Sequence, residues 1–404
     1  MGVDLIELYQ DLHRHPELGF AETRTAGVIS AAMRDLGLEV TEDVGGTGVV
    51  AVLANGPGPV VALRADMDAL PVREQTGLSY ASEAVAPGPD GVEVPVMHAC
   101  GHDMHVVWLI GAVERLVSSR DEWSGTLVAY FQPAEELAAG AQAMVDDGLA
   151  DRWPRPDVVL GQHLGPLPAG VVSVTSGPAM AGSDSLVLTF HGQGGHGSQP
   201  HRTVDPIVAA AAAVSQLQSI VARELDPATS AVVTVGTFHA GTKSNIIPSG
   251  AELGLNIRSE TEEVRDRILG AIARIAGGVA QAAGMTTPPT IVMKERAPAT
   301  INDDASAERV RSAFRAAFGD ASVIDFGAVT GSEDVSLLAT ASGAPLVFWF
   351  TGGVDPVAFA TAFAAGTVEA DIPANHSPFF APVLDPTIDR GVAALVTAAR
   401  EFFD

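Results

Sequence analysis

The sequence is poor in cysteine, lysine and aromatic residues. Cys100 is the only cysteine, Lys243 and Lys294 are the only lysines, and aromatic residues make up 5% of the chain. A single cysteine excludes an internal disulfide and favours a reducing compartment. The formal net charge of -26 repels polyanions from most of the surface. We therefore expect neither nucleic acid nor an anionic membrane as a partner.

The sequence also lacks a long uninterrupted hydrophobic run. Its alanine-rich stretches are broken by glycine or charge before they reach the roughly 20 residues that span a bilayer. Residues Met1–Glu7 contain no basic region followed by an apolar stretch, which a signal peptide would need. These absences predict a cytoplasmic protein without a membrane anchor.

The composition that remains is that of a globular protein with a large interior. Hydrophobic residues make up 47% and charged residues 18% of the 404 residues, and this length suggests two domains. The first part alternates helical and strand patterns, which indicates an α/β fold with a mostly parallel central sheet covered by helices. We expect helices at Asp4–Leu18, Glu22–Leu36 and Met104–Ser118, and strands at Gly48–Ala54, Val60–Asp66, Thr126–Phe131 and Val158–His163.

The pattern changes from about Ser183. Six segments follow in the order strand, helix, strand, strand, helix, strand, which is the order of a ferredoxin-like α+β unit. They are Ser185–His191, Val204–Glu224, Ala231–His239, Ala251–Ser259, Glu262–Ala283 and Thr290–Lys294. Because such a unit closes a core by itself, we predict that residues 182–296 form a domain inserted into a discontinuous domain of residues 1–181 and 297–404.

The densest group of possible metal ligands is Met97–His105. It holds three histidines and the only cysteine, directly ahead of an apolar helix. Thiolate and imidazole bind divalent transition metals, and the intervening glycine lets the backbone bring Cys100 and His102 to one point. Spacing alone leaves open whether His98 or His105 also contributes.

Further ligands are expected at strand ends and in a distant loop. Glu135 and Glu136 are adjacent and follow a strand, so one can bind a metal while the other takes a proton from a metal-held water. His163 ends another strand, and His376 lies in a loop far along the chain. Together with the first cluster, these residues supply enough imidazole and carboxylate for two metal ions.

Asp66 and Asp68 lie at the end of the strand Val60–Asp66 and directly after it. Residues two apart on an extended chain share a face, so both carboxylates are expected on the same side. They could be ligands, groups that orient a ligating histidine, or turn formers. We favour the orienting role for Asp68.

The inserted domain carries polar groups that could contact a substrate. Gly192–His201 is a glycine-rich loop in which His196 could donate a hydrogen bond to a developing oxyanion. Asn245 and Arg258 flank a short apolar segment and a strand, and an arginine there could pair with a substrate carboxylate. Serine catalysis is less supported, since no Gly-x-Ser-x-Gly motif is present.

Taken in order, these motifs resemble the M20-type metallopeptidases. Within them, the chain is most similar to the amidohydrolase branch of hippurate hydrolases, N-acyl-amino-acid hydrolases and auxin-conjugate hydrolases. The resemblance covers nearly the whole length. It rests on Asp66 and Asp68 and on residues 12–18 (LHRHPEL), 100–103 (CGHD), 132–136 (QPAEE), 194–196 (GGH), 245–248 (NIIP), 332–334 (SED) and 376–379 (HSPF).

The resemblance implies a two-metal catalytic domain, with manganese or zinc expected and cobalt or nickel as alternatives. It also implies a ferredoxin-like lid that makes a homodimer, or a tetramer. The matching ligand positions are Cys100, His102, Glu136, His163 and His376. Glu135 matches the general base, and His196 matches a lid histidine that reaches the partner subunit's active site. Asn245 and Arg258 match groups that hold a substrate carboxylate.

We therefore predict a metal-dependent amidohydrolase that cleaves N-acyl amino acids with water activated by Glu135. One alternative is a carboxypeptidase or dipeptidase acting on short peptides, and another is a catalytically silent protein that binds acyl amino acids. The sequence departs from the family before Arg258, where relatives have Gly-Thr, and after Asp334, where they have an aromatic residue. Residues 354–369 match poorly and are expected to be a loop. The acyl group, the amino acid, its chirality and the metal stay open.

Overall fold

The computed structural model describes residues 3–88 and 91–404. They form two compact units, of which the first comprises Met1–Ala179, Ile301–Gly327 and Asp334–Asp404, and the second comprises Met180–Thr300 and Ala328–Glu333. Residues 328–333 were expected in the catalytic domain. They join the second unit because the Ala181 amide donates to the Val329 carbonyl over 3.0 Å, and a β-bridge pairs Met180 with Val329.

The first unit is built on an eight-stranded sheet. In spatial order its strands are β1 (Glu39–Val44), β2 (Gly48–Asn55), β6 (Gly125–Gln132), β3 (Val60–Asp66), β7 (Val158–Pro168), β18 (Leu346–Val354), β8 (Val172–Val174) and β17 (Val323–Ile324). The central strands β6, β3, β7 and β18 run parallel, whereas β1 and β2 pair antiparallel with their neighbours. β8 is antiparallel to β18 and parallel to β17. The prediction of a mixed α/β fold with a mostly parallel central sheet is confirmed.

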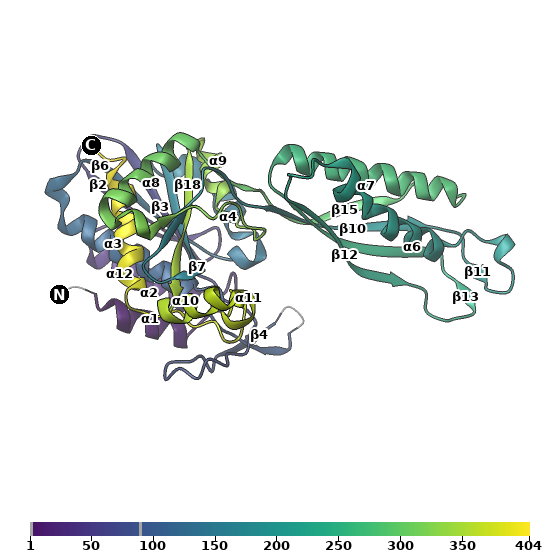
Figure 1. Ribbon diagram of the computed structural model, residues 1–404, viewed down its shortest axis with the longest axis horizontal. Helices are drawn as coiled ribbons and strands as arrows, with labels where there is room; N and C mark the ends of the chain where they lie inside the picture. Colours follow the sequence, from purple (N-terminus) through teal and green to yellow (C-terminus); the bar gives the residue numbers. More distant parts are fainter. Residues whose placement is uncertain (1–2, 89–90) are drawn as a thin grey trace. The chain divides into compact units, whose positions relative to one another are not determined.

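Helices cover both faces of this sheet. Figure 1 shows α3, α8 and α12 on one side and α4 and α9 on the other. The helices of the first unit are α1 (Leu5–Arg14), α2 (Thr23–Asp35), α3 (His102–Ser118), α4 (Gly140–Asp146), α5 (Leu149–Arg152), α8 (Asp304–Phe318), α9 (Ser336–Ser342), α10 (Pro356–Ala365), α11 (Val368–Asp371) and α12 (Thr387–Arg400). Strand β3 is therefore almost entirely buried, as its continuous apolar run indicates for a central parallel strand. Residues 101–113, at the start of α3, are buried as well.

Two local predictions for the first unit were wrong. A single helix was expected over Asp4–Leu18, but α1 ends at Arg14, because a residue that precedes proline, here His15, avoids helical backbone angles. Residues 354–369 were expected to be a loop, yet they include α10, which Asp355 caps by accepting from two backbone amides over 3.0 and 2.8 Å.

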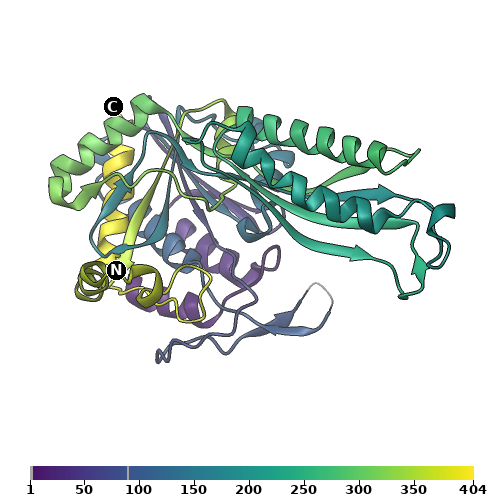
Figure 2. The ribbon, with the colours of Figure 1, turned by 45° about the vertical axis from the view of Figure 1, so that its right-hand side comes forward.

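The second unit is a four-stranded antiparallel sheet with two helices. The sheet order is β12 (Ala231–Ala240), β14 (Gly250–Ser259), β10 (Gly182–His191) and β15 (Thr290–Ala297). Helices α6 (Pro206–Leu217) and α7 (Glu262–Ala282) lie side by side against it (Figure 2). The chain order β10, α6, β12, β14, α7, β15 is strand, helix, strand, strand, helix, strand. This unit has its own hydrophobic core.

Four short strands form two further two-stranded sheets. β11 (Gly195–His196) pairs with β13 (Ile246–Ile247) in the second unit, and β4 (Val85–Pro87) pairs with β5 (Glu93–Pro95) in the first. Among residues 3–88 and 91–404, no helix has the length and hydropathy needed to cross a membrane.

Candidate metal centre

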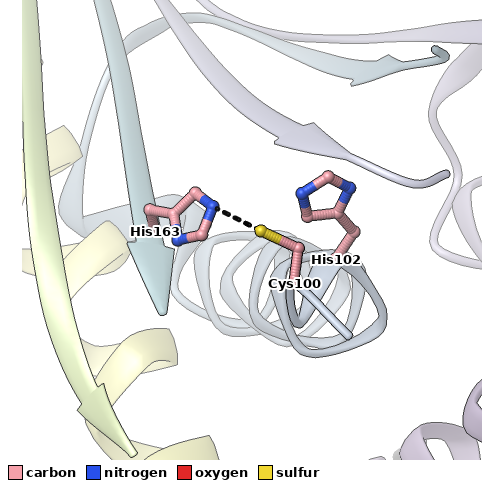
Figure 3. A group of neighbouring side chains, drawn as sticks. All are labelled: Cys100, His102 and His163. Atoms are coloured by element: carbon pink, nitrogen blue, oxygen red, sulfur yellow. Dashed lines mark hydrogen bonds between the residues drawn. The ribbon is translucent and has the colours of Figure 1, made fainter. Parts of the chain in front are cut away.

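Cys100 and His102 lie at the start of α3. Gly101 between them has φ of 86°, in the left-handed region that favours glycine. A Cβ atom on Gly101 would also lie 2.7 Å from the Leu164 side chain. The turn therefore needs a glycine, and it brings the sulfur and the imidazole to the same side of the helix end (Figure 3).

His163 faces this turn from the middle of β7, which continues to Pro168 and does not end at His163 as predicted, because β18 pairs with β7 beyond that residue. Its Nε2 atom lies 3.5 Å from Cys100 Sγ, and its Nδ1 atom lies 2.9 Å from the Leu164 carbonyl. Because a carbonyl only accepts, Nδ1 carries a proton, and Nε2 is the nitrogen that points at the sulfur. Figure 3 shows His163 and His102 on either side of the Cys100 sulfur. Cys100, His102 and His163 thus bring one sulfur and two imidazole nitrogens within 4.8 Å of one another.

Asp68 orients His102. Its Oδ1 atom lies 3.1 Å from His102 Nδ1, and its Oδ2 atom accepts from the Glu136 amide over 3.0 Å. With the Nδ1 proton directed at a carboxylate, His102 Nε2 is the nitrogen available to a cation. This buried atom has no hydrogen-bond partner among the described residues. It lies 3.9 Å from Glu135 Oε2 and 3.9 Å from Glu136 Oε1.

Glu135 and Glu136 stand on a tight turn after β6. Ala134 begins the turn with φ of 46°, and its amide donates to Glu22 Oε1 over 2.8 Å. Both glutamate side chains are about nine-tenths buried, with 11% and 10% of their surface exposed. The turn therefore holds two adjacent carboxylates against the histidine cluster.

The loop around His376 closes the cluster from the C-terminal part of the chain. His376 has φ of 70°, and its amide donates to the Ala99 carbonyl over 2.8 Å. The neighbouring Asn375 side chain donates to the Cys100 and Leu164 carbonyls, each over 3.1 Å. His376 Nε2 consequently lies 3.3 Å from Glu136 Oε1. Asn375 was not singled out in the sequence, because its partners are backbone atoms of distant segments.

Two histidines whose ligand role was open take other positions. His105 directs Nδ1 at Asp66, and its Nε2 accepts from the Leu164 amide over 2.8 Å. Although Asp66, His102 and His105 offer atoms within 4.8 Å of one another, neither nitrogen of His105 is left for a cation. His98 is buried and belongs to none of the ligand groups found in the described chain. The contacts therefore favour His102 over both.

The thiol, the imidazoles and the carboxylate of this cluster shift one another's pKa values. Burial alone would raise the pKa of the Cys100 thiol, but the facing His163 lowers it to about 6. Hydrogen bonding to Cys100 and then to Glu136 raises the pKa of His376 to about 10. Burial alone would also raise the pKa of Glu136, yet His376 and His102 lower it. The cluster holds thiolate and carboxylate next to protonated imidazoles, and a divalent cation can replace those protons.

Of the five possible ligand groups found among the described residues, two share Cys100. Cys100, His102 and His163 make one, and Cys100, Glu136 and His376 the other, each with atoms within 4.8 Å of one another. One buried atom of these groups, His102 Nε2, has no hydrogen-bond partner among the described residues. Sulfur and imidazole nitrogen with carboxylate oxygen suit zinc or a similar divalent ion. The residues present therefore fit two divalent cations.

A buried arginine that sequence reasoning missed supports the site. Arg64 is 1% exposed; it donates to Asp66 Oδ2 over 2.7 Å and to Gln132 Oε1 over 2.9 Å. Gln132 in turn donates to Asp334 over 2.5 Å. This network joins β3 to the strand that leads into Glu135. The signal was a charged residue inside the apolar run Val60–Asp66.

The residues predicted to contact the substrate lie in the second unit. His196 is exposed on β11, where its Nδ1 lies 2.7 Å from the Ser198 hydroxyl. The Asn245 carbonyl accepts from the Gly197 amide over 2.9 Å, so His196 and Asn245 belong to the same turn pair. Arg258 lies on β14 and donates to Ser332 over 2.8 Å and to Asn256 over 3.0 Å. Burial lowers the pKa of this guanidinium.

A buried group of thiolate, imidazoles and carboxylates at the carboxyl ends of parallel strands, with a further carboxylate beside it, defines the class of metal-dependent hydrolases. A family model described as Peptidase family M20/M25/M40 matches residues 62–401. The chain belongs to this family of metal-dependent hydrolases, as the motifs predicted.

Proteins of named activity and one solved structure are similar over most of the chain. Thermostable carboxypeptidase 1 of Saccharolobus solfataricus is 36% identical over 353 residues, which cover 86% of this chain and 85% of that protein. Hippurate hydrolase of Campylobacter jejuni is 40% identical over 316 residues, covering 78% and 79%. The Bacillus subtilis YXEP protein, titled a dinuclear metal binding peptidase from the M20 family, superposes with a TM-score of 0.78 at 29% identity, covering 98% and 96%.

Proposed function

We propose that this protein hydrolyses the amide bond of N-acyl amino acids. The observation that carries the proposal is the position of Glu135 Oε2, 3.9 Å from the unpartnered Nε2 atom of His102. A carboxylate beside a ligand group is placed to act on the same water as the cations. Hippurate hydrolase, whose name denotes an N-acyl amino acid substrate, is 40% identical to this chain.

The ligands of the two cations are proposed to be Cys100, His102, Glu136, His163 and His376. The ions, Mn²⁺ or Zn²⁺ with Co²⁺ or Ni²⁺ as alternatives, polarise the amide carbonyl when bound and lower the pKa of a water molecule. Glu135 then accepts a proton at a carboxylate oxygen while the water oxygen bonds to the carbonyl carbon. When the C–N bond breaks, Glu135 returns that proton to the amine. Asp68 keeps His102 in the required orientation.

The substrate carboxylate is assigned to the second unit. A guanidinium forms paired hydrogen bonds with a carboxylate, so Arg258 is proposed to hold that group together with Asn245. His196 would donate a hydrogen bond to the oxyanion from the partner subunit of a homodimer formed through this unit. Since Cys100 acts as a thiolate here, a reducing cytoplasm suits the protein best.

A carboxypeptidase or dipeptidase is the second candidate. It is favoured by the 36% identity to thermostable carboxypeptidase 1, and the same centre would serve it. The two candidates differ in the group on the acyl side of the scissile bond, which is an acyl group in an N-acyl amino acid and an amino acid or peptide in a peptidase substrate. A catalytically silent binding protein is less supported, because the chain has Glu135 and a full set of possible metal ligands.

A substrate panel tests the proposal. The full-length protein, loaded in turn with manganese, zinc, cobalt or nickel, is given N-acetyl and N-benzoyl amino acids of both chiralities and a set of dipeptides. We expect a higher kcat/KM for the N-acyl amino acids, measured as release of the free amino acid. A preference for dipeptides would select the second candidate. Binding without turnover under every metal would select the silent binding protein.

A further inference from the structure

One motif of the sequence has no part in the proposed reaction. Residues 12–18 (LHRHPEL) form the end of α1 and the turn after it. Within this motif His13 is 1% exposed and faces two carboxylates. Its Nδ1 atom lies 2.7 Å from Asp103 Oδ2, and its Nε2 atom lies 3.2 Å from Glu74 Oε1.

The carboxylates of Asp103 and Glu74 also accept hydrogen bonds from other groups. Asp103 Oδ1 accepts from the Met104 amide over 2.8 Å. Glu74 accepts from the Ser82 amide over 2.6 Å and from the Thr76 hydroxyl. An ionised carboxylate has no proton to donate, so each ring nitrogen of His13 must supply its own. The geometry therefore describes a buried imidazolium between two anions.

The surroundings of this imidazolium are aromatic and acidic. The rings of Tyr9 and Tyr80 each lie 5.5 Å from the His13 ring. The titratable groups facing it are these two phenols, Glu74 and Asp103, with His98 beyond Asp103. Burial alone would lower the pKa of His13, but the hydrogen bonds to Asp103 and Glu74 raise it to about 9. The positive charge of the His13 ring is thus stabilised by neighbouring carboxylates and not by solvent.

The three groups come from segments that carry the metal centre. Asp103 follows His102 directly at the start of α3, and Glu74 lies in the segment that follows Asp68. The same motif makes a second contact with that segment, since the Ala69 amide donates to the Glu17 carbonyl over 2.8 Å. Residues 12–18 therefore contact Asp103, the neighbour of His102, and Ala69, the neighbour of Asp68.

We propose that His13 is a positioning residue of the metal centre, clamping the turn that carries Cys100 and His102 to the segment that carries Asp68. The clamp acts through hydrogen bonds from a charged ring to two carboxylates, and the 2.7 Å bond to Asp103 has the short length of a charge-assisted bond, whereas the 3.2 Å contact with Glu74 is longer. This inference rests on the proposed metal centre. It adds a role for the first histidine of the motif, which touches no ligand atom.

The first test measures metal affinity. The metal-free full-length protein is titrated with Zn²⁺ against a chelating dye at pH 7.5, as wild type, His13→Asn and His15→Asn. We expect His13→Asn to weaken zinc binding by about 10–100-fold, the usual effect of losing a group that supports metal ligands. His15→Asn is the matched control, because the His15 side chain is 48% exposed and its Nδ1 atom has its polar contacts with Asp11. It should bind zinc as the wild type does.

The second test reads the protons on the ring. In the wild type, ¹⁵N NMR should show a proton on both nitrogens of His13 at pH 7.5, and Glu74→Gln should leave only one. Global loosening of the fold would also leave a single proton, because an exposed imidazole has a pKa of about 6.5, so the Glu74→Gln protein must unfold in urea as the wild type does. A wild type that binds no zinc overturns the metal centre itself. Unchanged zinc affinity in folded His13→Asn, or a single ring proton in the wild type, overturns the clamp. If His13→Asn does not fold, the test uses Glu74→Gln instead. A Glu74→Gln protein in which His13 is neutral but zinc binds as tightly as in the wild type would overturn the clamp.

Discussion

Hydrogen-bond partners decide the chemistry of the histidines on α3. His102 and His105 occupy neighbouring turns of one helix and are both buried. His102 has a carboxylate at Nδ1 and no hydrogen-bond partner at Nε2, whereas His105 has partners at both nitrogens. An imidazole can bind a cation only through a nitrogen with a lone pair left over. The surroundings of each ring therefore separate a candidate ligand from a structural group.

Replacing Glu135 by glutamine should separate catalysis from metal binding. The amide keeps the size of the side chain but cannot take a proton, so turnover should fall by at least ~10²-fold. Metal content should stay at the wild-type level, because the two ligand groups that share Cys100 do not include Glu135. Steady-state kinetics and metal analysis of the purified variant measure both.

Glu136→Gln is the matched comparison for this prediction. It changes the adjacent carboxylate in the same way, but Glu136 belongs to a ligand group with Cys100 and His376. We expect this variant to lose metal affinity together with activity. Near-normal turnover in Glu135→Gln would contradict its role as the base.

At the scale of elements, the turn between β6 and α4 holds the two glutamates. Gly140, the first residue of α4, lies so close to the preceding turn that a Cβ atom there would stand 1.5 Å from the Pro133 carbonyl oxygen. Asp334 also accepts from the Ala141 amide over 3.1 Å, which joins the start of α4 to the Arg64 network. The backbone around Glu135 can thus follow its observed path only because Gly140 has no side chain.

Gly140→Ala should destabilise the first unit by about 1–3 kcal/mol, the typical cost of inserting a group into a packed site. It should also lower activity, since relief of the clash moves the Glu135 turn. Urea unfolding followed by tryptophan fluorescence measures the effect, because all four tryptophans lie in the first unit.

Gly27→Ala in α2 provides the control, because a Cβ atom there meets nothing within 4 Å. Alanine is favoured over glycine inside a helix, so this variant should be stabilised by roughly 0.5–1 kcal/mol. Equal unfolding curves for Gly140→Ala and the wild type would show that the turn is not tightly packed.

At the scale of the whole molecule, the proposed site residues are divided between two units with separate cores. The five proposed metal ligands and Glu135 lie in the first unit, and His196, Asn245 and Arg258 lie in the second. Each core is closed without the other, as expected for an inserted domain. The substrate groups and the metal groups are therefore carried on separately folded parts of one chain.

Mixing two inactive variants tests whether subunits share a site. His196→Ala removes the proposed oxyanion donor and Glu135→Gln removes the proposed base. If His196 acts in the partner's site, co-refolding the two variants should restore part of the hydrolytic activity, because some sites then contain both intact groups. Each variant refolded alone is the control. No recovery in mixtures that have formed dimers would argue that each subunit uses its own His196.

The sequence by itself determined the family and the α/β class, because residue chemistry and hydrophobic periodicity are local properties. It proposed Cys100, His102, Glu136, His163 and His376 as ligands but left open whether His105 also contributes. Only the tertiary structure shows that both nitrogens of His105 have partners, since Asp66 and Leu164 come from other strands. The same holds for Arg64 and His13. A buried charge is recognised by its partners, and those partners meet only when the chain has folded.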